Sequence, residues 1–273
     1  MEKSVAFLGA GSMAEAIIAG MTSNKIVPAQ QIVATNHSNK SRLSELAKMY
    51  QIRTSQDRKE VIEQSDVLIL AMKPKDIKVA TTELKPLLTE DKIIVSLLAG
   101  ISTSFIEQQL ETKNPVIRVM PNTSAMIGES ATTIAAGLHA SKEQVHMIEE
   151  LMTAIGTTTV INEEDMDAFT ALAGSGPAFY YFMVEAIEQF ADEKGLDQEI
   201  AKPLMVQTIK GVAKMLDVSE DSPQTLREKI TSPGGTTEAG VQTLADHHFQ
   251  QTIKACLNQA TERSKELREL FEK

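Results

Sequence analysis

Residues 4–21 read S-V-A-F-L-G-A-G-S-M-A-E-A-I-I-A-G-M, an apolar run, a glycine-rich turn and then a helical pattern. This order is the fingerprint of a dinucleotide-binding strand-to-helix unit, with Ala14 in its third small position. Gly9 is expected to make the tight turn, and Gly11 to let a pyrophosphate approach the backbone at the helix start. A plain strand-to-helix turn is the alternative, which the placement of the motif disfavours.

The composition excludes several classes of protein. The 273 residues are 42% hydrophobic and 23% charged, which is typical of a globular chain of one large or two ordinary domains. A formal net charge of −10 argues against nucleic acid as the main partner, because duplex binding needs a cationic face. No apolar run approaches transmembrane length, so a cytoplasmic location without a membrane partner is expected.

The cysteine and histidine usage predicts no metal site. Cys256 is the single cysteine, which excludes an internal disulfide, and no Cys/His spacing is typical of zinc. Cys256 lies at helical spacing between apolar residues and is interpreted as core filler.

Apolar runs continue the strand-and-helix alternation after the first unit. Strands are expected at residues 31–35, 66–71, 92–98 and 115–120, and two more at 131–136 and 157–161 flank a helix at 141–154. The sequence therefore predicts an α/β fold with a Rossmann-type domain over residues 1–161. Ligands of such sheets bind at the carboxyl ends of the strands. Lys73, which follows one of these strands, is a candidate cofactor contact or a solvated lysine.

From residue 162 onward the pattern is helical only. Helices are expected at residues 165–172, after Pro177, after Asp197, at 223–230 and at 249–271. The helix after Pro177 is apolar nearly all round, which indicates burial against another subunit. An all-α domain over residues 162–273 is therefore expected to mediate self-association.

The stretch Lys229–Gly240, K-I-T-S-P-G-G-T-T-E-A-G, interrupts these helices with small hydrogen-bonding residues. Gly234 and Gly235 permit close backbone approach, and Thr236 and Thr237 open a helix whose unpaired NH groups favour an anion. Such a loop can hold a carboxylate while a threonine hydroxyl reaches a neighbouring atom. The alternative is an ordinary turn with an N-cap.

The end of the second strand bears on cofactor choice. Sites that prefer NAD usually place an acidic residue there for the ribose 2′-hydroxyl. Here the chain reads T-N-H-S from Thr35, and Lys40 and Arg42 follow. NADPH is therefore the expected cofactor, with NADH as the alternative donor, unless Lys40 and Arg42 are only solvated helix residues.

The chemistry expected of such a chain is hydride transfer. Reduction of a ketone leaves an alkoxide and calls for a strong proton donor. The β-hydroxyacid dehydrogenases, which share this two-domain plan, place a lysine in the helix after a similar glycine break, whereas P-A-F-Y-Y-F-M-V from Pro177 offers none. A protonated cyclic imine accepts hydride directly, so imine reduction is favoured.

Five sequence blocks resemble the pyrroline-5-carboxylate reductases over essentially the whole chain. They are G-A-G-S-M-A from Gly9, A-M-K-P from Ala71, R-V-M-P-N-T from Arg118, A-G-S-G-P-A-F from Ala173 and S-P-G-G-T-T from Ser232. The resemblance implies reduction of 1-pyrroline-5-carboxylate to L-proline by NAD(P)H, the last step of proline biosynthesis. It also implies assembly through the helical domain, as a homodimer or a larger ring.

The resemblance further implies the residues of the site. The cofactor contacts would be Leu8, Gly9, Ala10, Gly11, Ser12, Met13, Asn36, Ala71, Met72, Lys73, Pro74, Leu97, Leu98 and Ala99. The substrate contacts would be Glu164, Ser232, Gly234, Gly235, Thr236 and Thr237. Thr237 falls where the family has its proposed donor to the imine nitrogen. Glu164 is alternatively part of an acidic helix start.

Two positions depart from the family pattern. Arg58 and Lys229 stand where many members have asparagine. Arg58 is a candidate contact to an NADP phosphate, with a different mode of cofactor binding as the alternative. Lys229 is a candidate substrate contact whose role is open. The alternatives to the reductase are a related NADPH-dependent imine or hydroxyacid reductase and a non-catalytic paralogue that binds dinucleotide.

Overall fold

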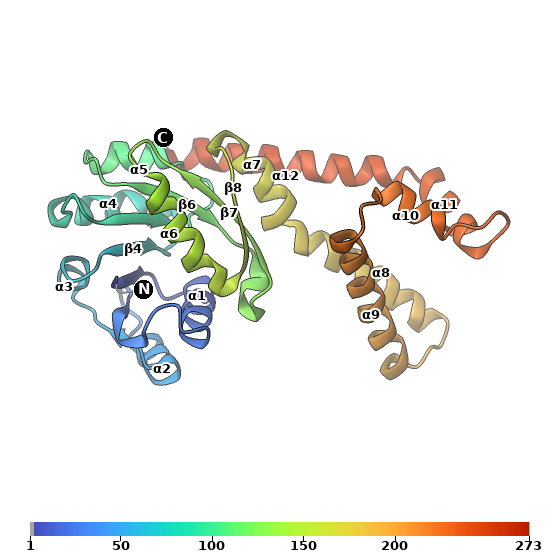
Figure 1. Ribbon diagram of the computed structural model, residues 1–273, viewed down its shortest axis with the longest axis horizontal. Coiled ribbons are helices and arrows are strands. Elements are labelled where there is room, and N and C mark those ends of the chain that lie inside the picture. The colour runs from blue at the N-terminus through green and yellow to red at the C-terminus, as the bar shows by residue number, and fades with distance from the viewer. Residues whose placement is uncertain (1–2, 273) are drawn as a thin grey trace. The chain divides into compact units, whose positions relative to one another are not determined.

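One mixed sheet organises the first part of the chain (Figure 1). The structure is a computed structural model that describes residues 3–272. Within these residues the strands are β1 (Val5–Leu8), β2 (Ile32–Thr35), β3 (Arg53–Thr54), β4 (Val67–Leu70), β5 (Ile93–Ser96), β6 (Val116–Met120), β7 (Ser130–Ala136) and β8 (Gly156–Val160). Their order across the sheet is β3-β2-β1-β4-β5-β6-β7-β8.

Strand β1 lies inside the sheet and fixes its register on both sides. Val5 pairs with Ile32 of β2 and with Val67 of β4, and both ladders are parallel. Strand β7 runs antiparallel to β6 and parallel to β8. The strands β1, β2, β4, β5 and β6 are buried along their whole length, which is typical of parallel strands covered on both faces.

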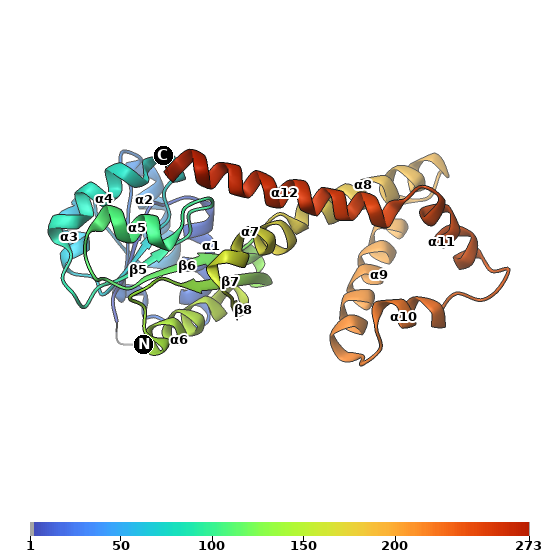
Figure 2. The ribbon, with the colours of Figure 1, turned by 90° about the horizontal axis from the view of Figure 1, so that it is seen from above.

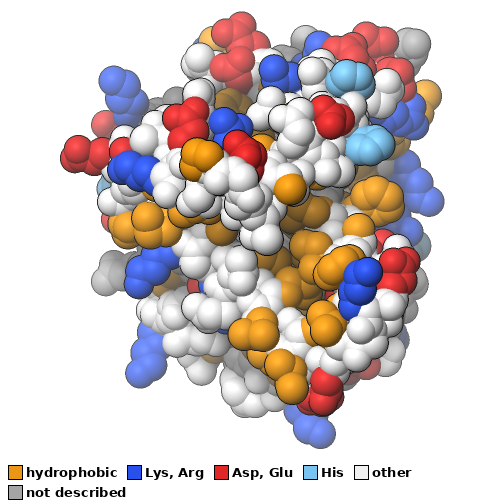
Figure 3. All heavy atoms as spheres, turned by 90° about the vertical axis from the view of Figure 1, so that its right-hand side faces the viewer, with side chains coloured by type: hydrophobic (Ala, Val, Ile, Leu, Met, Phe, Trp, Pro, Cys, Tyr) orange, Lys and Arg blue, Asp and Glu red, His pale blue; other side chains and the backbone are white. Residues whose placement is uncertain are grey.

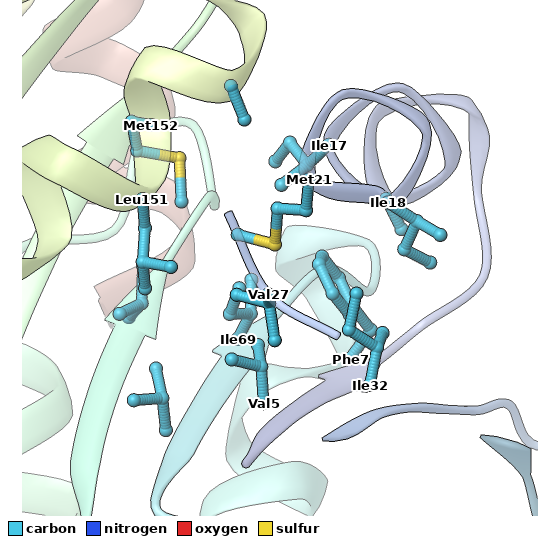
Figure 4. Packing of buried hydrophobic residues seen from close by; sticks show 14 of the residues in the cluster. Val5, Phe7, Ile17, Ile18, Met21, Val27, Ile32, Ile69, Leu151 and Met152 are labelled. Atoms are coloured by element: carbon cyan, nitrogen blue, oxygen red, sulfur yellow. The ribbon is translucent and has the colours of Figure 1, made fainter. Parts of the chain in front are cut away.

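Helices cover both faces of this sheet, as Figure 2 shows from above. The helices α1 (Ser12–Ser23), α2 (Lys40–Tyr50) and α6 (Lys142–Met152) pack on one face, where Phe7, Ile17, Met21 and Leu151 meet (Figure 4). The helices α3 (Arg58–Glu63), α4 (Ile77–Leu84) and α5 (Thr103–Leu110) pack on the other face. Each face therefore has its own apolar core.

Short helical segments connect these elements. They are η1 (Ala29–Gln31), η2 (Pro74–Asp76), η3 (Lys85–Leu87), η4 (Thr123–Ile127), η5 (Thr153–Ile155) and η6 (Glu163–Asp165). Side-chain caps fix several helix starts. Ser102 accepts a hydrogen bond from Phe105 N, and Ser141 forms a capping box with Gln144, as short polar side chains before a helix do.

The remainder of the chain is helical. The elements are α7 (Met166–Phe169), a π-helical turn η7 (Thr170–Gly174), α8 (Gly176–Glu193), α9 (Gln198–Val218), α10 (Pro223–Lys229), α11 (Thr236–Asp246) and α12 (Phe249–Glu272). The fold class expected from the sequence, a Rossmann-type α/β domain followed by helices, is confirmed. The helix expected at 165–172 is instead α7 followed by the π-helical turn, and the two-residue strand β3 is too short to show a sequence pattern.

Backbone contacts group the chain into two units. The sheet unit contains the residues up to Pro177 together with those from Asn258 onward, and the helical unit spans Ala178–Leu257. The boundary expected at residue 162 marks the end of the strands. By backbone contacts, the sheet unit also includes residues that precede and follow the helical unit in the sequence. The physical reason is that Asp167 of α7 accepts a hydrogen bond from Ser264 Oγ at 2.7 Å and pairs with Arg268 at 3.2 Å. Phe271 also packs against the core of the sheet unit.

Within residues 3–272, no helix combines the length and the hydrophobicity needed to cross a membrane.

The close packing of α1 on η5 gives a test of the fold. A Cβ added at Gly20 would lie 2.3 Å from Ala154 O, which already accepts a hydrogen bond from Asn24. Alanine favours the helix by about 1 kcal/mol over glycine, but the backbone of η5 must shift. We expect Gly20→Ala to lower the free energy of unfolding by about 1–3 kcal/mol in urea titrations. Ser44→Ala, at an exposed position of α2, is the control and should change it by less than about 0.5 kcal/mol; a stabilised Gly20→Ala would contradict the packing.

Candidate functional site

The carboxyl ends of β1, β2, β4 and β5 meet at one edge of the sheet. Gly9 N donates to Thr35 O at 2.9 Å, so the turn after β1 is tied to the end of β2. Ala71 N donates to Leu8 O at 3.0 Å, which ties the end of β4 to β1. This is the point where the strand order reverses from β2 to β4 around β1, the place where open α/β sheets bind ligands.

The two glycines of the turn have different reasons to be glycine. Gly9 has φ +127°, and a Cβ there would lie 2.4 Å from Ala71 O. Above Gly11, by contrast, no atom lies within 4 Å of an added Cβ. Gly11 is also the N-cap of α1 and offers no capping side chain. The described residues provide no acceptor for the NH groups of Ser12 and Met13, so this helix start is open to an anion.

A cavity of about 700 Å³ opens at this edge of the sheet. Its volume lies within the range of small-ligand sites, about 300–1,000 Å³. Eight residues predicted to contact the cofactor line it, namely Gly9, Ala10, Gly11, Asn36, Arg58, Ala71, Met72 and Lys73. The sequence motifs at the ends of three different strands are therefore brought to one place.

The other predicted cofactor residues do not line this cavity. They are Leu8, Ser12, Met13, Pro74, Leu97, Leu98 and Ala99. Leu8 and Leu98 are buried in the core of the α4 and α5 face. The backbone of Leu97 donates to Leu70 O at 3.1 Å, and Ala99 is exposed in the loop that follows. Their part in cofactor binding stays a prediction.

Five lining residues were not anticipated from the sequence. They are His37, Lys75, Asp76, Val79 and Ala80. His37 adjoins the predicted Asn36, and Lys75 and Asp76 follow the A-M-K-P block, so proximity in the chain was the available signal. Val79 and Ala80 reach the cavity from α4, and that depends on how this helix packs on the sheet.

The cationic residues of the cavity differ in their partners. Arg58 forms an ion pair with Glu83 of α4. Lys73 is exposed, and the described part of the chain gives it no ion-pair partner. Lys73 thus remains free to meet an anionic group, whereas Arg58 must share its charge with Glu83.

A second hollow of about 190 Å³ adjoins the first and is lined by Ala10, Asn36, His37, Ser38, Asn39 and Arg42. Asn36 closes the turn below it, since its Oδ1 accepts from Asn39 N at 2.9 Å. Arg42 donates from Nε to Ala10 O at 3.1 Å and forms an ion pair with Glu15 of α1. The hydrogen bond with Glu15 raises the pKa of Arg42 above its usual value.

A buried arginine fixes the segment that leads from the sheet into the helices. Arg118 of β6 is fully buried, and its Nη1 lies 3.5 Å from Glu163 Oε1. Burial lowers the pKa of this guanidinium, an effect that Glu163 and then Asp167 oppose. Glu163 also accepts a hydrogen bond from Thr103 N at 2.8 Å, at the start of α5. Its neighbour Glu164 is exposed and lines a separate hollow of about 480 Å³ beside β8.

The predicted substrate loop lies in the helical unit. Gly235 N donates to Ser232 O at 3.0 Å, which closes a turn with Gly234 at φ +73°, and Gly235 is the N-cap of α11. Within the described residues the NH groups of Thr236 and Thr237 have no acceptor, and both threonines are exposed. The chain thus brings Ser232, Gly234, Gly235, Thr236 and Thr237 together around one helix start.

Two charged side chains near this loop have partners within the helical unit. Gly234 N donates to the carboxylate of Glu238 at 2.7 Å, so one amide predicted to bind the substrate already has an acceptor. Lys229 forms an ion pair with Asp221, at the other end of α10. The structure therefore gives Lys229 a partner within its own unit, and a direct substrate contact by Lys229 stays a prediction.

The helical unit buries few of its apolar side chains. Among residues 178–257, Ala191 is the one hydrophobic residue that is buried. Tyr180, Tyr181 and Phe182 are exposed by 67%, 61% and 77%. Hydrophobic side chains are also numerous on the face drawn in Figure 3. A surface this apolar is typical of an interface.

Family models match both parts of the chain. Residues 163–267 match the model for pyrroline-5-carboxylate reductase dimerisation, and residues 4–100 match that for coenzyme F420-dependent NADP oxidoreductases. Pyrroline-5-carboxylate reductase 1 of Bacillus subtilis is 47% identical over 272 residues, which cover 100% of this chain and 92% of the relative. The chain belongs to the pyrroline-5-carboxylate reductase family.

Other members of the family are similar to this chain over nearly its whole length. The Staphylococcus aureus pyrroline-5-carboxylate reductase is 37% identical and covers 96% of both chains. A solved reductase of the family from Coxiella burnetii superimposes with a TM-score of 0.90 at 33% identity, covering 98% of this chain and 99% of its own. The Plasmodium falciparum pyrroline carboxylate reductase, solved with NADP bound, gives 0.89 at 26% identity and covers 98% of both chains.

The pairing of Arg118 with Glu163 predicts that neutralising Glu163 destabilises the protein more than neutralising its neighbour Glu164. Glu163→Gln should lower the free energy of unfolding by about 2–3 kcal/mol, because it removes the nearest carboxylate from a buried cation and leaves only the weaker interaction with Asp167. Glu164→Gln is the matched control: the described residues give Glu164 no ion-pair partner, and the change should stay within about 0.5 kcal/mol. Chemical denaturation of both variants is the measurement, and equal effects would show that Glu163 does not stabilise Arg118.

Proposed function

We propose that this protein reduces 1-pyrroline-5-carboxylate to L-proline with NADPH as the preferred hydride donor, the last step of proline biosynthesis. The observation that carries the proposal is full-length similarity, at 47% identity, to a pyrroline-5-carboxylate reductase. The cavity at the ends of β1, β2 and β4 supports a dinucleotide site in the same chain. The Plasmodium falciparum relative with NADP bound supports the choice of cofactor.

The residues of the cavity fit a dinucleotide. The open face of Gly11 and the free NH groups at the start of α1 would hold the pyrophosphate. Ala71, Met72 and Lys73 line the same cavity. Bound there, NADPH supplies a hydride to an electrophilic carbon.

The loop before α11 would bind the substrate. The free NH groups of Thr236 and Thr237 provide donors for the carboxylate, helped by the positive end of the α11 dipole. The hydroxyl of Thr237 would donate a hydrogen bond to the neutral ring nitrogen and relay a proton to it. The protonated imine would then accept hydride at its carbon and leave as the neutral amine. Glu238 and Asp221 would not contact the substrate. Glu238 accepts a hydrogen bond from Gly234 N, and Asp221 forms an ion pair with Lys229.

Self-association belongs to the same proposal. The exposed aromatic side chains of α8 and the match to the dimerisation model support a homodimer formed through the helical unit, or a larger ring built from such dimers. An 80-residue helical segment that buries so little cannot offset its conformational entropy alone. A cytoplasmic location is proposed with it.

Purified protein should oxidise NADPH when 1-pyrroline-5-carboxylate is added, and the Michaelis constant for NADPH should be lower than that for NADH. The measurement is initial rate against each cofactor by absorbance of the reduced nicotinamide. A panel of keto acids and hydroxy acids is the substrate control and should give no comparable rate. Turnover of a keto acid alone would favour a related reductase, and no turnover at all would favour a non-catalytic paralogue.

Removal of the Thr237 hydroxyl tests the role of the loop. Thr237→Val should lower kcat by about 10²-fold, as for the loss of one donor at a reacting atom. The Michaelis constant for NADPH should not change. Thr243→Val is the matched control, since Thr243 lies on the same helix and its hydroxyl bonds Ala239 O at 3.0 Å. Thr237→Val with unchanged kcat would remove the donor role while leaving the family assignment intact.

A further inference from the structure

The second hollow, beside β2, is lined by an arginine that already has carboxylate partners. Arg42 is the arginine that follows β2, at the place where Rossmann-type sites distinguish a ribose 2′-hydroxyl from a 2′-phosphate. Its guanidinium has three acceptors: the carbonyl of Ala10 at 3.1 Å, the carboxylate of Glu15, and Glu45 at 3.4 Å. A 2′-phosphate would have to compete with two carboxylates for this side chain.

Glu15 is the stronger of these two competitors. It lies on α1, one turn beyond the glycine loop, and both of its oxygens are held. One accepts from Tyr50 OH at 3.1 Å, and the other is paired with Arg42. The Glu15 and Arg42 side chains are each only 24% exposed, whereas Glu45 is 60% exposed, so solvent screens the contact with Glu45 much more.

We propose, on the basis of the dinucleotide site proposed above, that Glu15 sets the balance between NADPH and NADH by withholding Arg42 from the 2′-phosphate. NAD-preferring sites place their acidic residue at the end of the second strand. This chain has none there and places a carboxylate beside the same pocket from α1 instead. Glu15 is thus a specificity-determining residue that acts through Arg42, while the exposed Lys40 and His37 remain available to the phosphate.

Replacement of Glu15 by its neutral isostere gives the test. In Glu15→Gln, Arg42 keeps a neutral hydrogen-bonding neighbour but loses the charge that holds it. We expect the dissociation constant for NADP⁺ to fall by about tenfold, the factor that one charge-assisted hydrogen bond supplies. The dissociation constant for NAD⁺, which has no 2′-phosphate, should change by less than about twofold. Both are measured by calorimetric titration of the full-length protein at one fixed salt concentration.

Glu45→Gln is the matched control, because it makes the same chemical change at the other carboxylate near Arg42. Its ratio of NADP⁺ to NAD⁺ affinity should stay within about twofold of the parent protein, since this contact is longer and exposed. An equal effect of both substitutions would show a general charge effect and overturn the proposal. A loss of NADP⁺ affinity in Glu15→Gln would also overturn it, because Glu15 would then orient Arg42 toward the phosphate.

A second variant tests the same idea without altering Glu15. If Arg42 is withheld, Arg42→Ala should change NADP⁺ affinity little in the parent protein but should abolish the gain in the Glu15→Gln background. A large and selective loss of NADP⁺ affinity from Arg42→Ala alone would overturn the proposal. Failure of the parent protein to bind either dinucleotide would remove the proposed function itself, which distinguishes the two failures.

Discussion

The contact between the turn after β1 and the end of β4 is the constraint on which the rest of the sheet unit depends. Gly9 approaches the carbonyl of Ala71 so closely that a methyl group would lie 2.4 Å from it. The hydrogen bonds of β1 to β2 and β4 hold that approach in place. Because β1 lies inside the sheet, its turn can open only toward the edge where β2 and β4 also end. The cavity, the free helix start of α1 and the A-M-K-P segment all lie at this edge.

Unlike the sheet unit, the helical unit has almost no apolar core of its own. Its helices carry good caps, such as Asp197 before α9 and Ser222 before α10, so local sequence forms each helix well. Capping supplies about 1 kcal/mol per helix, whereas ordering each residue costs about as much, so apolar burial must come from elsewhere. The loop proposed to bind substrate lies in this unit. Its geometry therefore depends on assembly as well as on its glycines and threonines.

Ion pairs between distant segments decide which charges are available at the sites. The sequence makes Arg42 and Arg58 candidate contacts to a phosphate, but each has a carboxylate partner more than 20 residues away, Glu15 and Glu83 respectively. Arg118 is a different case: it is held fully inside the sheet unit and secures the segment leading to α7. Charge counted along the chain predicts the cations near a site but not their competitors, because pairing depends on which helices pack together.

The elements that depend on local chemistry could be predicted from the residues alone. The glycine turn before α1, the buried runs of β1, β4 and β5 and the glycine–threonine start of α11 were all predicted, because backbone freedom and apolar runs act over a few residues. Tertiary structure alone decided that Val79 and Ala80 line the cavity and that Asp167 joins α7 to the end of α12. It also decided that Glu15 holds Arg42. These contacts join segments whose separation in the chain carries no local signal, so only the packing of helices on the sheet brings them together.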